Sequence, residues 1–289
     1  MSPEDNHKKS VSRYFSEDKD YWKTVYNDTL GKWTGFIDFE MRKRKELLYY
    51  KVKNTSLKKD DKILDIGCGT GGMLEEMAKD DYNLVAADIS FDMIRETQKM
   101  SCKHRAEDIL CVQSDIEHIP FGNNSFSCII CAGVLQYLQK DDAAIRELAR
   151  IVTHDGTIMV TVPNLLRINN LLDPVYYLRI FQLIIHKLKT KKRNSRQVSD
   201  ERDLEKNSDF SNRRYLYWQI RNFFRKIIPA RIESIPISYG PLTLFRKEFL
   251  PLTLSIKLSN IVQRLSCKRG FGFLKIFANR WIFCLKKTN

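Results

Sequence analysis

The sequence predicts an α/β fold: a doubly wound, Rossmann-like sheet of seven mostly parallel strands with helices on both faces, plus a helical insertion and C-terminal additions. Three observations support this. Short apolar runs alternate with helical stretches between residues 63 and 163, as expected for parallel strands buried on both faces. A glycine-rich loop follows the first run directly, where such a sheet places its ligand. Two further strand-like runs lie in the C-terminal part of the chain.

The predicted elements alternate in the order that βαβ units require. Strands are expected at residues 63–66, 84–87, 109–112, 128–132, 157–162, 231–238 and 280–285. Helices are expected at residues 36–52, 72–79, 91–100, 141–152, 212–228 and 246–277. The helix at 141–152 has one apolar stripe, with Ala144, Ile145, Leu148 and Ile151 at helical spacing, which indicates a single buried face.

The chain divides into four predicted parts. Residues 1–34 form an N-terminal cap whose Tyr- and Trp-rich stretch, 11–26, is a candidate cover for a site. Residues 35–163 form the core domain. Residues 164–211 are an amphipathic basic insertion, helical over 165–188 and a polar loop after it. Residues 212–289 complete the sheet and add helical parts that face a substrate or a membrane.

Charge is distributed unevenly along the chain. The net charge is +14, but residues 165–289 carry +18 and residues 1–164 carry −4. A basic half can meet phosphate in nucleic acid, in anionic lipid or in a phosphorylated substrate, and a solvated basic surface explains it as well. The polar N-terminus predicts a cytoplasmic protein without a signal peptide. The seven cysteines favour reduced thiols, and no metal site is predicted.

The glycine loop runs from Asp65 to Gly72 as Asp-Ile-Gly-Cys-Gly-Thr-Gly-Gly. Its glycines also fit the G-x-G-x-x-G dinucleotide pattern, so the glycines alone do not identify the ligand. Asp65 favours a zwitterionic amino-acid ligand, because its carboxylate would repel a pyrophosphate and attract an ammonium or sulfonium group. Asp88 ends the second predicted strand, where it can accept hydrogen bonds from ribose hydroxyls. Taken singly, the glycines could serve only a tight turn and Asp88 only a helix cap.

The segment resembles the class I S-adenosylmethionine-dependent methyltransferases, in particular the ubiquinone/menaquinone-type group (methyltransferase domain 11-like). The resemblance covers about 100 residues. The matching pieces are residues 63–73, 87–90 with Met93, 114–121, 124–128, 134–138 and 147–152. It implies S-adenosylmethionine as the cofactor and makes residues 35–163 the cofactor-binding core.

The resemblance also implies a role for each matching residue. Fifteen residues would bind the cofactor: Asp65, Gly67, Cys68, Gly69, Thr70, Gly71, Asp88, Ile89, Met93, Ser114, Asp115, Ile116, Cys131, Ala132 and Gln136. Asp65 and the loop would hold the methionine part, Asp88 the ribose, and Asp115 the adenine amino group. The residues after the fourth strand would line the sulfonium end. The chain departs from its relatives at Gln136, where they often carry histidine, and no catalytic base is assigned.

The methyl acceptor is left open by the sequence. A small molecule, either hydrophobic or membrane-linked (a quinone, a tetrapyrrole or a lipid-linked sugar), is one interpretation, with RNA methylation by the basic half as an alternative. A third is a non-catalytic protein that binds S-adenosylmethionine as a sensor or partner. Apolar, aromatic and cationic residues are mixed at helical spacing in 174–193 and 212–226, as in helices that lie in a membrane interface. A helix that faces the protein core and has a basic outer face fits this pattern equally well. Peripheral contact with the inner face of an anionic membrane is therefore a hypothesis, and nucleic-acid binding is the less favoured one.

Overall fold

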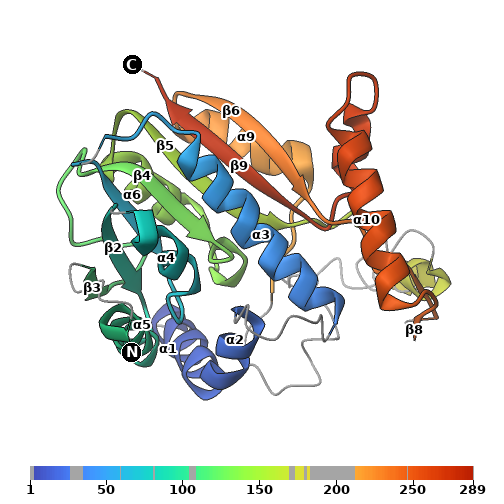
Figure 1. Ribbon diagram of the computed structural model, residues 1–289, viewed down its shortest axis with the longest axis horizontal. Coiled ribbons are helices and arrows are strands. Elements are labelled where there is room, and N and C mark those ends of the chain that lie inside the picture. Colours follow the sequence, from blue (N-terminus) through green and yellow to red (C-terminus); the bar gives the residue numbers. More distant parts are fainter. Residues whose placement is uncertain are drawn as a thin grey trace.

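A seven-stranded sheet forms the centre of the protein (Figure 1). The computed structural model describes residues 3–26, 35–58, 60–80, 82–103, 109–168, 173–178, 181–182, 212–245 and 247–288. The strand order is β3-β2-β1-β4-β5-β9-β6. The strands are β1 (Lys62–Ile66), β2 (Asn83–Asp88), β3 (Leu110–Gln113), β4 (Phe126–Ala132), β5 (Val152–Pro163), β6 (Ala230–Ile237) and β9 (Arg280–Lys287). Strand β9 runs in the opposite direction to the other six strands, so its pairings with β5 and β6 are antiparallel, and the remaining pairings in this sheet are parallel. The predicted fold class is confirmed.

Helices cover both faces of the sheet, and the strand residues alternate between the two resulting cores. One core contains strand residues such as Leu64 and Ile158, packed against α6 and α9. The other contains residues such as Ile63 and Met159, packed against α3, α4 and α5. The helices are α3 (Phe36–Lys53), α4 (Gly72–Met77), α5 (Phe91–Lys103), α6 (Asp142–Ile151) and α9 (Tyr217–Ile227). The central strands are apolar at successive positions because both faces of the sheet are buried.

The apolar stripe of α6 behaves as its spacing predicts. Ala144, Ile145, Leu148 and Ile151 are all fully buried against the sheet. Each large side chain buried in this way stabilises the fold by roughly 1.5–3 kcal/mol relative to an exposed one.

Two N-terminal helices lie at the end of the sheet where β1 and β2 finish (Figure 1). They are α1 (Pro3–Glu17) and α2 (Lys19–Tyr26). Short 3₁₀ helices, Ala78–Asp80 and Leu135–Tyr137, follow α4 and β4. The helices at the N-terminus and the loops after the strands therefore meet on one side of the molecule.

The C-terminal part differs from the sequence prediction in two places. Helix α9 begins at Tyr217 rather than at residue 212, because the residues before it run along the end of β5: the Tyr215 amide donates to the Pro163 carbonyl at 3.0 Å. The stretch 246–277 is not one helix. It begins in a hairpin of β7 (Thr243–Leu244) and β8 (Lys247–Glu248), and α10 (Leu252–Ser266) starts only after Pro251. Proline has no amide hydrogen to donate and is tolerated at a helix start but not in its interior.

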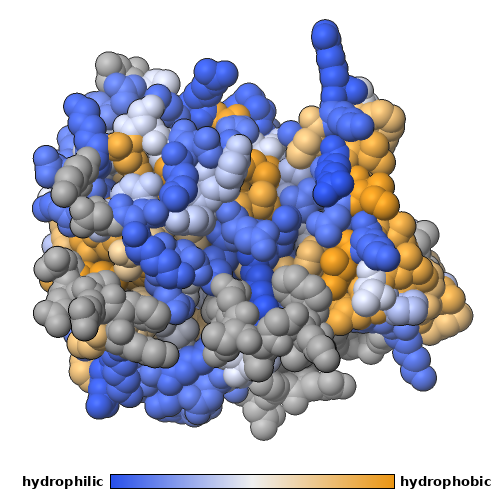
Figure 2. All heavy atoms as spheres, viewed as in Figure 1, coloured by the Kyte–Doolittle hydropathy of each residue, from blue (hydrophilic) through white to orange (hydrophobic). Residues whose placement is uncertain are grey.

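After α10 the chain turns at Gly270, whose φ of +93° favours glycine. A 3₁₀ helix, η4 (Gly272–Phe277), then leads into β9. Apolar surface gathers over α10 on the side of the molecule shown in Figure 2. None of the helices that the structure describes combines the length and the hydropathy needed to cross a bilayer. The predicted basic loop at 189–211 lies outside the described residues.

Candidate functional site

A cavity of about 390 Å³ lies at the ends of β1, β2 and β4. Its floor is the glycine loop between β1 and α4, and its walls come from α1, α2, α3 and the loops after β2, β3 and β4. The volume falls in the usual range for small-molecule sites. The position is the one that open α/β sheets use for ligands.

Three glycines of the loop, Gly67, Gly69 and Gly71, have positive φ. A Cβ on Gly67 would lie 2.2 Å from the Val134 side chain, and one on Gly71 would lie 2.7 Å from Met100. A Cβ on Gly69 would meet no protein atom within 4 Å, although Gly69 lines the cavity. The backbone at Gly69 is therefore accessible to a ligand, as the sequence prediction requires.

Asp65 is a buried carboxylate at the end of β1, on the sheet face that α3 covers. Burial and the nearby Asp88 carboxylate raise the pKa of Asp65 to about 7, although the Arg44 guanidinium on α3 lowers it. A cationic group bound beside Asp65 would favour the ionised carboxylate. This side of the cavity is thus suited to a positively charged ligand group.

Asp88 both lines the cavity and holds its floor in place. Its Oδ2 accepts a hydrogen bond from the Gly69 amide at 2.9 Å, and its Oδ1 accepts one from the Ser90 amide at 2.8 Å. Burial raises the pKa of Asp88, and these two amides oppose the rise. The helix-cap and ligand roles considered for Asp88 are therefore compatible, since each oxygen has a second lone pair.

The loop after β3 carries Asp115, which contacts the N-terminal helix. Lys8 of α1 forms ion pairs with Asp115 at 2.7 Å and with Glu117 at 2.5 Å. Partial burial lowers the pKa of Lys8, but the two carboxylates raise it to about 12. The Asp115 Oδ1 accepts from the Glu117 amide at 2.9 Å. Asp115 therefore fastens α1 over the cavity in addition to the adenine contact that the resemblance implies.

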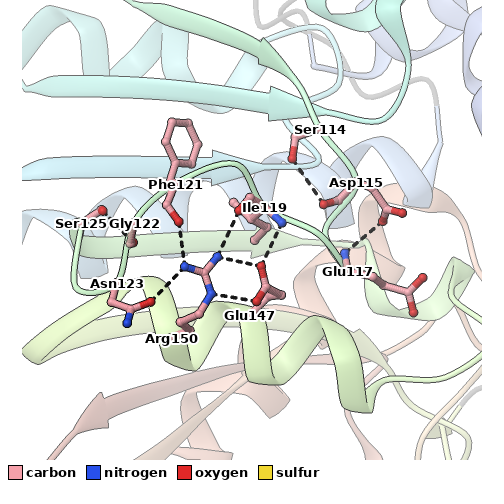
Figure 3. Close-up of polar contacts among 10 residues, drawn as sticks. All are labelled: Ser114, Asp115, Glu117, Ile119, Phe121, Gly122, Asn123, Ser125, Glu147 and Arg150. Carbon is pink, nitrogen blue, oxygen red and sulfur yellow. Dashed lines mark hydrogen bonds and ion pairs between the residues drawn. The ribbon is translucent and has the colours of Figure 1, made fainter.

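Two residues of α6 hold the same loop from its other side (Figure 3). Arg150 donates to the carbonyls of Phe121 at 2.7 Å and Ile119 at 3.0 Å, and it pairs with Glu147 at 2.8 Å. Glu147 in turn accepts from the Ile119 amide at 2.9 Å. The loop is thereby tied to a helix packed on the sheet.

We expect Arg150→Lys to loosen this loop. A lysine ammonium cannot reproduce the planar fork that reaches two carbonyls and a carboxylate at once, so the free energy of unfolding should fall by about 1–3 kcal/mol. Thermal unfolding would measure the loss, and amide exchange should increase at residues 114–122. Arg146→Lys, at an exposed position of the same helix, should change neither; equal effects in the two variants would contradict the assignment.

The structure brings together most of the predicted cofactor residues. Thirteen of the fifteen line the cavity. Gly71 and Cys131 do not: Gly71 lies close to Thr97 and Met100 at the start of α4, and Cys131 is a fully buried residue of β4. For these two positions a cofactor contact stays a prediction.

Several residues that line the cavity were not found from the sequence. They are His7 and Lys8 of α1, Arg44 and Lys45 of α3, and Arg280 of β9. His7 Nε2 lies 2.7 Å from the Tyr137 carbonyl oxygen. In the sequence these residues stand among other charged or polar residues and carry no motif.

Arg280 connects the last strand to the predicted residue Gln136. Its Nη1 donates to the Gln136 Oε1 at 3.0 Å, and its Nε donates to Glu40 at 2.6 Å. Burial alone would raise the pKa of Glu40, but Arg280 and hydrogen bonds from Asn279 and Ser238 hold it below its ordinary value. This ionised network fixes the Gln136 side chain at the cavity wall.

Comparison with known proteins matches the part of the chain that forms the floor of this cavity. Residues 64–160 match the family model described as "Methyltransferase domain". Residues 64–160 therefore form a domain of the S-adenosylmethionine-dependent methyltransferase type. The match includes the glycine loop, Asp88 and the loop after β3.

Curated relatives agree with this domain but are distant. The chain is 33% identical over 100 residues to a demethylmenaquinone methyltransferase of Corynebacterium urealyticum, covering 35% of this chain and 40% of that protein. It is 27% identical over 142 residues to a ubiquinone/menaquinone biosynthesis C-methyltransferase of Teredinibacter turnerae, covering 47% and 55%. The chain thus spans about half the length of the curated relatives it matches or less.

A solved structure shows the same fold over nearly the whole chain. Magnesium protoporphyrin IX methyltransferase from Synechocystis, determined with bound S-adenosylhomocysteine (SAH), aligns with a TM-score of 0.58 at 14% identity and covers 97% of this chain and 100% of that one. At this identity the likeness is one of fold.

Proposed function

We propose that this chain transfers a methyl group from S-adenosylmethionine to a small, largely apolar acceptor. The observation that carries the proposal is the accessible backbone at Gly69 between two buried carboxylates, Asp65 and Asp88. This floor fits a ligand that presents an ammonium group and ribose hydroxyls. It does not fit a dinucleotide pyrophosphate, because Asp65 would repel it.

The residues present fit the cofactor part by part. Asp65 and the backbone of Gly67–Thr70 would hold the methionine amino end, with Arg44 supplying a cation for its carboxylate. Asp88 would accept from the ribose hydroxyls, while Ile89, Met93 and Ile116 would pack on the adenine. Ser114 and Asp115 would flank the adenine edge, and Ala132 and Gln136 the sulfonium end. All of these residues line the cavity.

When bound, the cofactor supplies a methyl group on a positively charged sulfur. The task of the chain is then to align an acceptor and exclude water. Helix α1 covers the cavity and is fastened by the Lys8 ion pairs. Arg280 keeps Gln136 in one orientation. The Lys8 contacts thus hold α1 over the adenine end of the cavity, and the Arg280 contact orients a side chain at the sulfonium end.

Aromatic side chains form the remaining wall and support an apolar acceptor. Tyr14, Phe15 and Trp22 of α1 and α2 line the cavity with Tyr137. The Phe15 ring lies 5.0 Å from the Tyr137 ring, edge to face, and 5.7 Å from the Trp22 ring. Aromatic walls with few polar groups suit a planar or hydrophobic substrate. Quinones, which the names of the curated relatives include, are acceptors of this kind, and so are tetrapyrroles.

RNA methylation and non-catalytic binding remain the competing functions. A cavity of about 390 Å³ under α1 favours a small acceptor over a nucleic-acid strand. Incubation with methyl-labelled S-adenosylmethionine and, separately, a lipid extract, sugar nucleotides and RNA tests all three. We expect label in an extractable small molecule; label in RNA alone would contradict the proposal. SAH binding without any transfer would support a sensor instead.

Replacing Asp88 with alanine should weaken SAH binding by about 1.5–3 kcal/mol, since ribose hydroxyls and the Gly69 amide would lose their acceptor. Calorimetric titration measures the loss. Asp92→Ala, on the first turn of α5 and outside the cavity lining, is the matched control and should bind SAH as the wild type does. Unchanged binding by the Asp88 variant would remove Asp88 from the site.

A further inference from the structure

Helix α10 buries four small or amide polar side chains against the protein and leaves several large apolar side chains exposed. Its buried residues are Ser255, Ser259, Gln263 and Ser266. Leu254, Leu258 and Ile261 are 42%, 37% and 52% exposed. Their spacing of four and three residues places them on one face. A surface helix of a globular protein normally has the opposite arrangement.

The buried polar face is held by specific hydrogen bonds. Ser259 Oγ accepts from the Tyr239 amide at 2.9 Å, and Gln263 Nε2 donates to the Pro236 carbonyl at 3.1 Å. Ser266 Oγ donates to the Gln263 carbonyl at 2.7 Å. The bonds of Ser259 and Gln263 join α10 to β6 and the residues after it, so they fix the rotation of the helix and the outward orientation of its leucines.

Exposed aromatic residues occur in the segments at both ends of α10. Phe245 of the β7–β8 hairpin is 65% exposed, Phe249 is 50% exposed, and Phe271 in the turn after the helix is 46% exposed. Together with Leu254, Leu258 and Ile261 they make up what we call the α10 surface. Figure 2 shows apolar surface gathered over α10 with hydrophilic side chains beside it. Monomeric proteins seldom leave such a contiguous apolar area without a partner.

The charge around the α10 surface is almost entirely positive. Residues 242–277 contain seven Lys or Arg and a single acidic residue, Glu248. Lys257 and Arg264 are exposed on α10 itself, three residues after Leu254 and Ile261 and hence beside the apolar stripe. Long basic side chains can lay their aliphatic stems along an apolar layer while keeping the charge at its polar edge.

These properties distinguish between occupants. A second copy of the chain would bring two positive surfaces together, and a nucleic acid would leave the leucines and phenylalanines in water. An anionic lipid bilayer offers both an apolar layer and negative headgroups. We propose that the α10 surface docks this protein on an anionic membrane.

The docking surface adjoins the cavity through α3. Ile37 of α3 lines the cavity and is 60% exposed. The neighbouring Phe36 ring lies 3.5 Å from the position of a Cβ on Gly240, just before the β7–β8 hairpin. Docking would therefore place the mouth of the cavity near the bilayer, within reach of an apolar acceptor. This last step rests on the proposed function; the docking itself does not.

Vesicle flotation of the whole chain tests the proposal. Binding is expected to vesicles of phosphatidylglycerol and phosphatidylcholine in equal amounts, to weaken when salt is raised, and to be much lower with phosphatidylcholine alone. The double variant Leu258→Ser/Ile261→Ser should bind the anionic vesicles at least tenfold less. Lys257→Ser/Arg264→Ser should lose about tenfold and part of the salt dependence, since five other Lys or Arg residues remain in 242–277.

The matched control replaces exposed apolar residues elsewhere. Tyr50→Ser/Leu110→Ser removes side chains that are 62% and 54% exposed on α3 and β3 and should float as the wild type does. All variants should keep the wild-type SAH affinity, which separates this test from that of the proposed function. No vesicle binding, equal binding to neutral vesicles, or equal loss in the control would overturn the proposal. So would a dimer that the α10 substitutions dissociate.

Discussion

Asp65→Asn is expected to lower the affinity for SAH by about 100-fold or more. The substitution keeps the shape of the side chain but removes the charge that would pair with the ligand ammonium, and a lost charged partner in a buried site costs about 3 kcal/mol. Calorimetry measures the loss. Asp61→Asn is the control and should bind normally, because Asp61 lies just before β1, at the end of the strand opposite Asp65, and accepts hydrogen bonds from Ser127 and the Lys58 amide.

Asp65→Asn should also remove the pH dependence of SAH binding. Because the pKa of Asp65 is raised to about 7 in the free protein, a bound ammonium group should lower it and release a proton on binding. SAH affinity of the wild type is therefore expected to rise between about pH 6 and pH 8, while the affinity of the asparagine variant stays level over that range. An identical slope in both proteins would show that Asp65 does not meet the ligand charge.

The stability of the ligand-free protein should fall as the pH rises, whereas its affinity for SAH should increase. The pKa of Asp65 is about 7 in the folded protein and about 4 in the unfolded chain. The protonated carboxyl group therefore stabilises the fold fully below pH 4, and this contribution is lost as the pH rises through about 7. At pH 8 the free Asp65→Asn protein should thus melt several degrees above the wild type, with the difference vanishing near pH 4. A lower melting temperature at pH 8 would contradict the burial of an ionised Asp65.

Gly69→Val should abolish SAH binding while the fold persists. The new side chain has space around it in the protein, so it would project into the cavity where the ligand must approach the backbone. The positive φ of Gly69, +57°, adds a conformational cost of about 1–2 kcal/mol.

Gly270→Val separates these two effects. Gly270 also has a positive φ, +93°, and open space around it, but it lies outside the cavity. We expect a similar fall in melting temperature for both variants and normal SAH binding for Gly270→Val alone. Normal binding by Gly69→Val would show that no ligand rests on this loop.

The sheet and the floor of the cavity could be predicted because their signals are local. The central strands β1, β2, β4 and β5 contain continuous apolar runs, and Asp65, the glycines and Asp88 are fixed by the ends of β1 and β2. Local sequence signals do not identify Arg44 and Lys8 as cavity residues, because these side chains reach the cavity only through the packing of α3 and α1. Lys8 contacts a residue 107 positions away, and Arg280 contacts one 240 positions away.

Helix α10 illustrates a second limit of sequence patterns. Its leucines at helical spacing predict an amphipathic helix, but the pattern does not say which face is buried. The hydrogen bonds of Ser259 and Gln263 decide this by turning the polar face inward. The start of the predicted helix was wrong for a simpler reason: residues 247–251 precede α10 because Pro251 lacks the amide hydrogen that a continuous helix needs there.

The central claim is that the cavity over the glycine loop binds S-adenosylmethionine. Calorimetric titration of the purified protein with SAH and with NAD, in the same buffer, tests it most directly. The Asp65, Gly69 and Asp88 geometry predicts SAH binding in the micromolar range and detectably weaker NAD binding. Tight binding of NAD with none of SAH would contradict it.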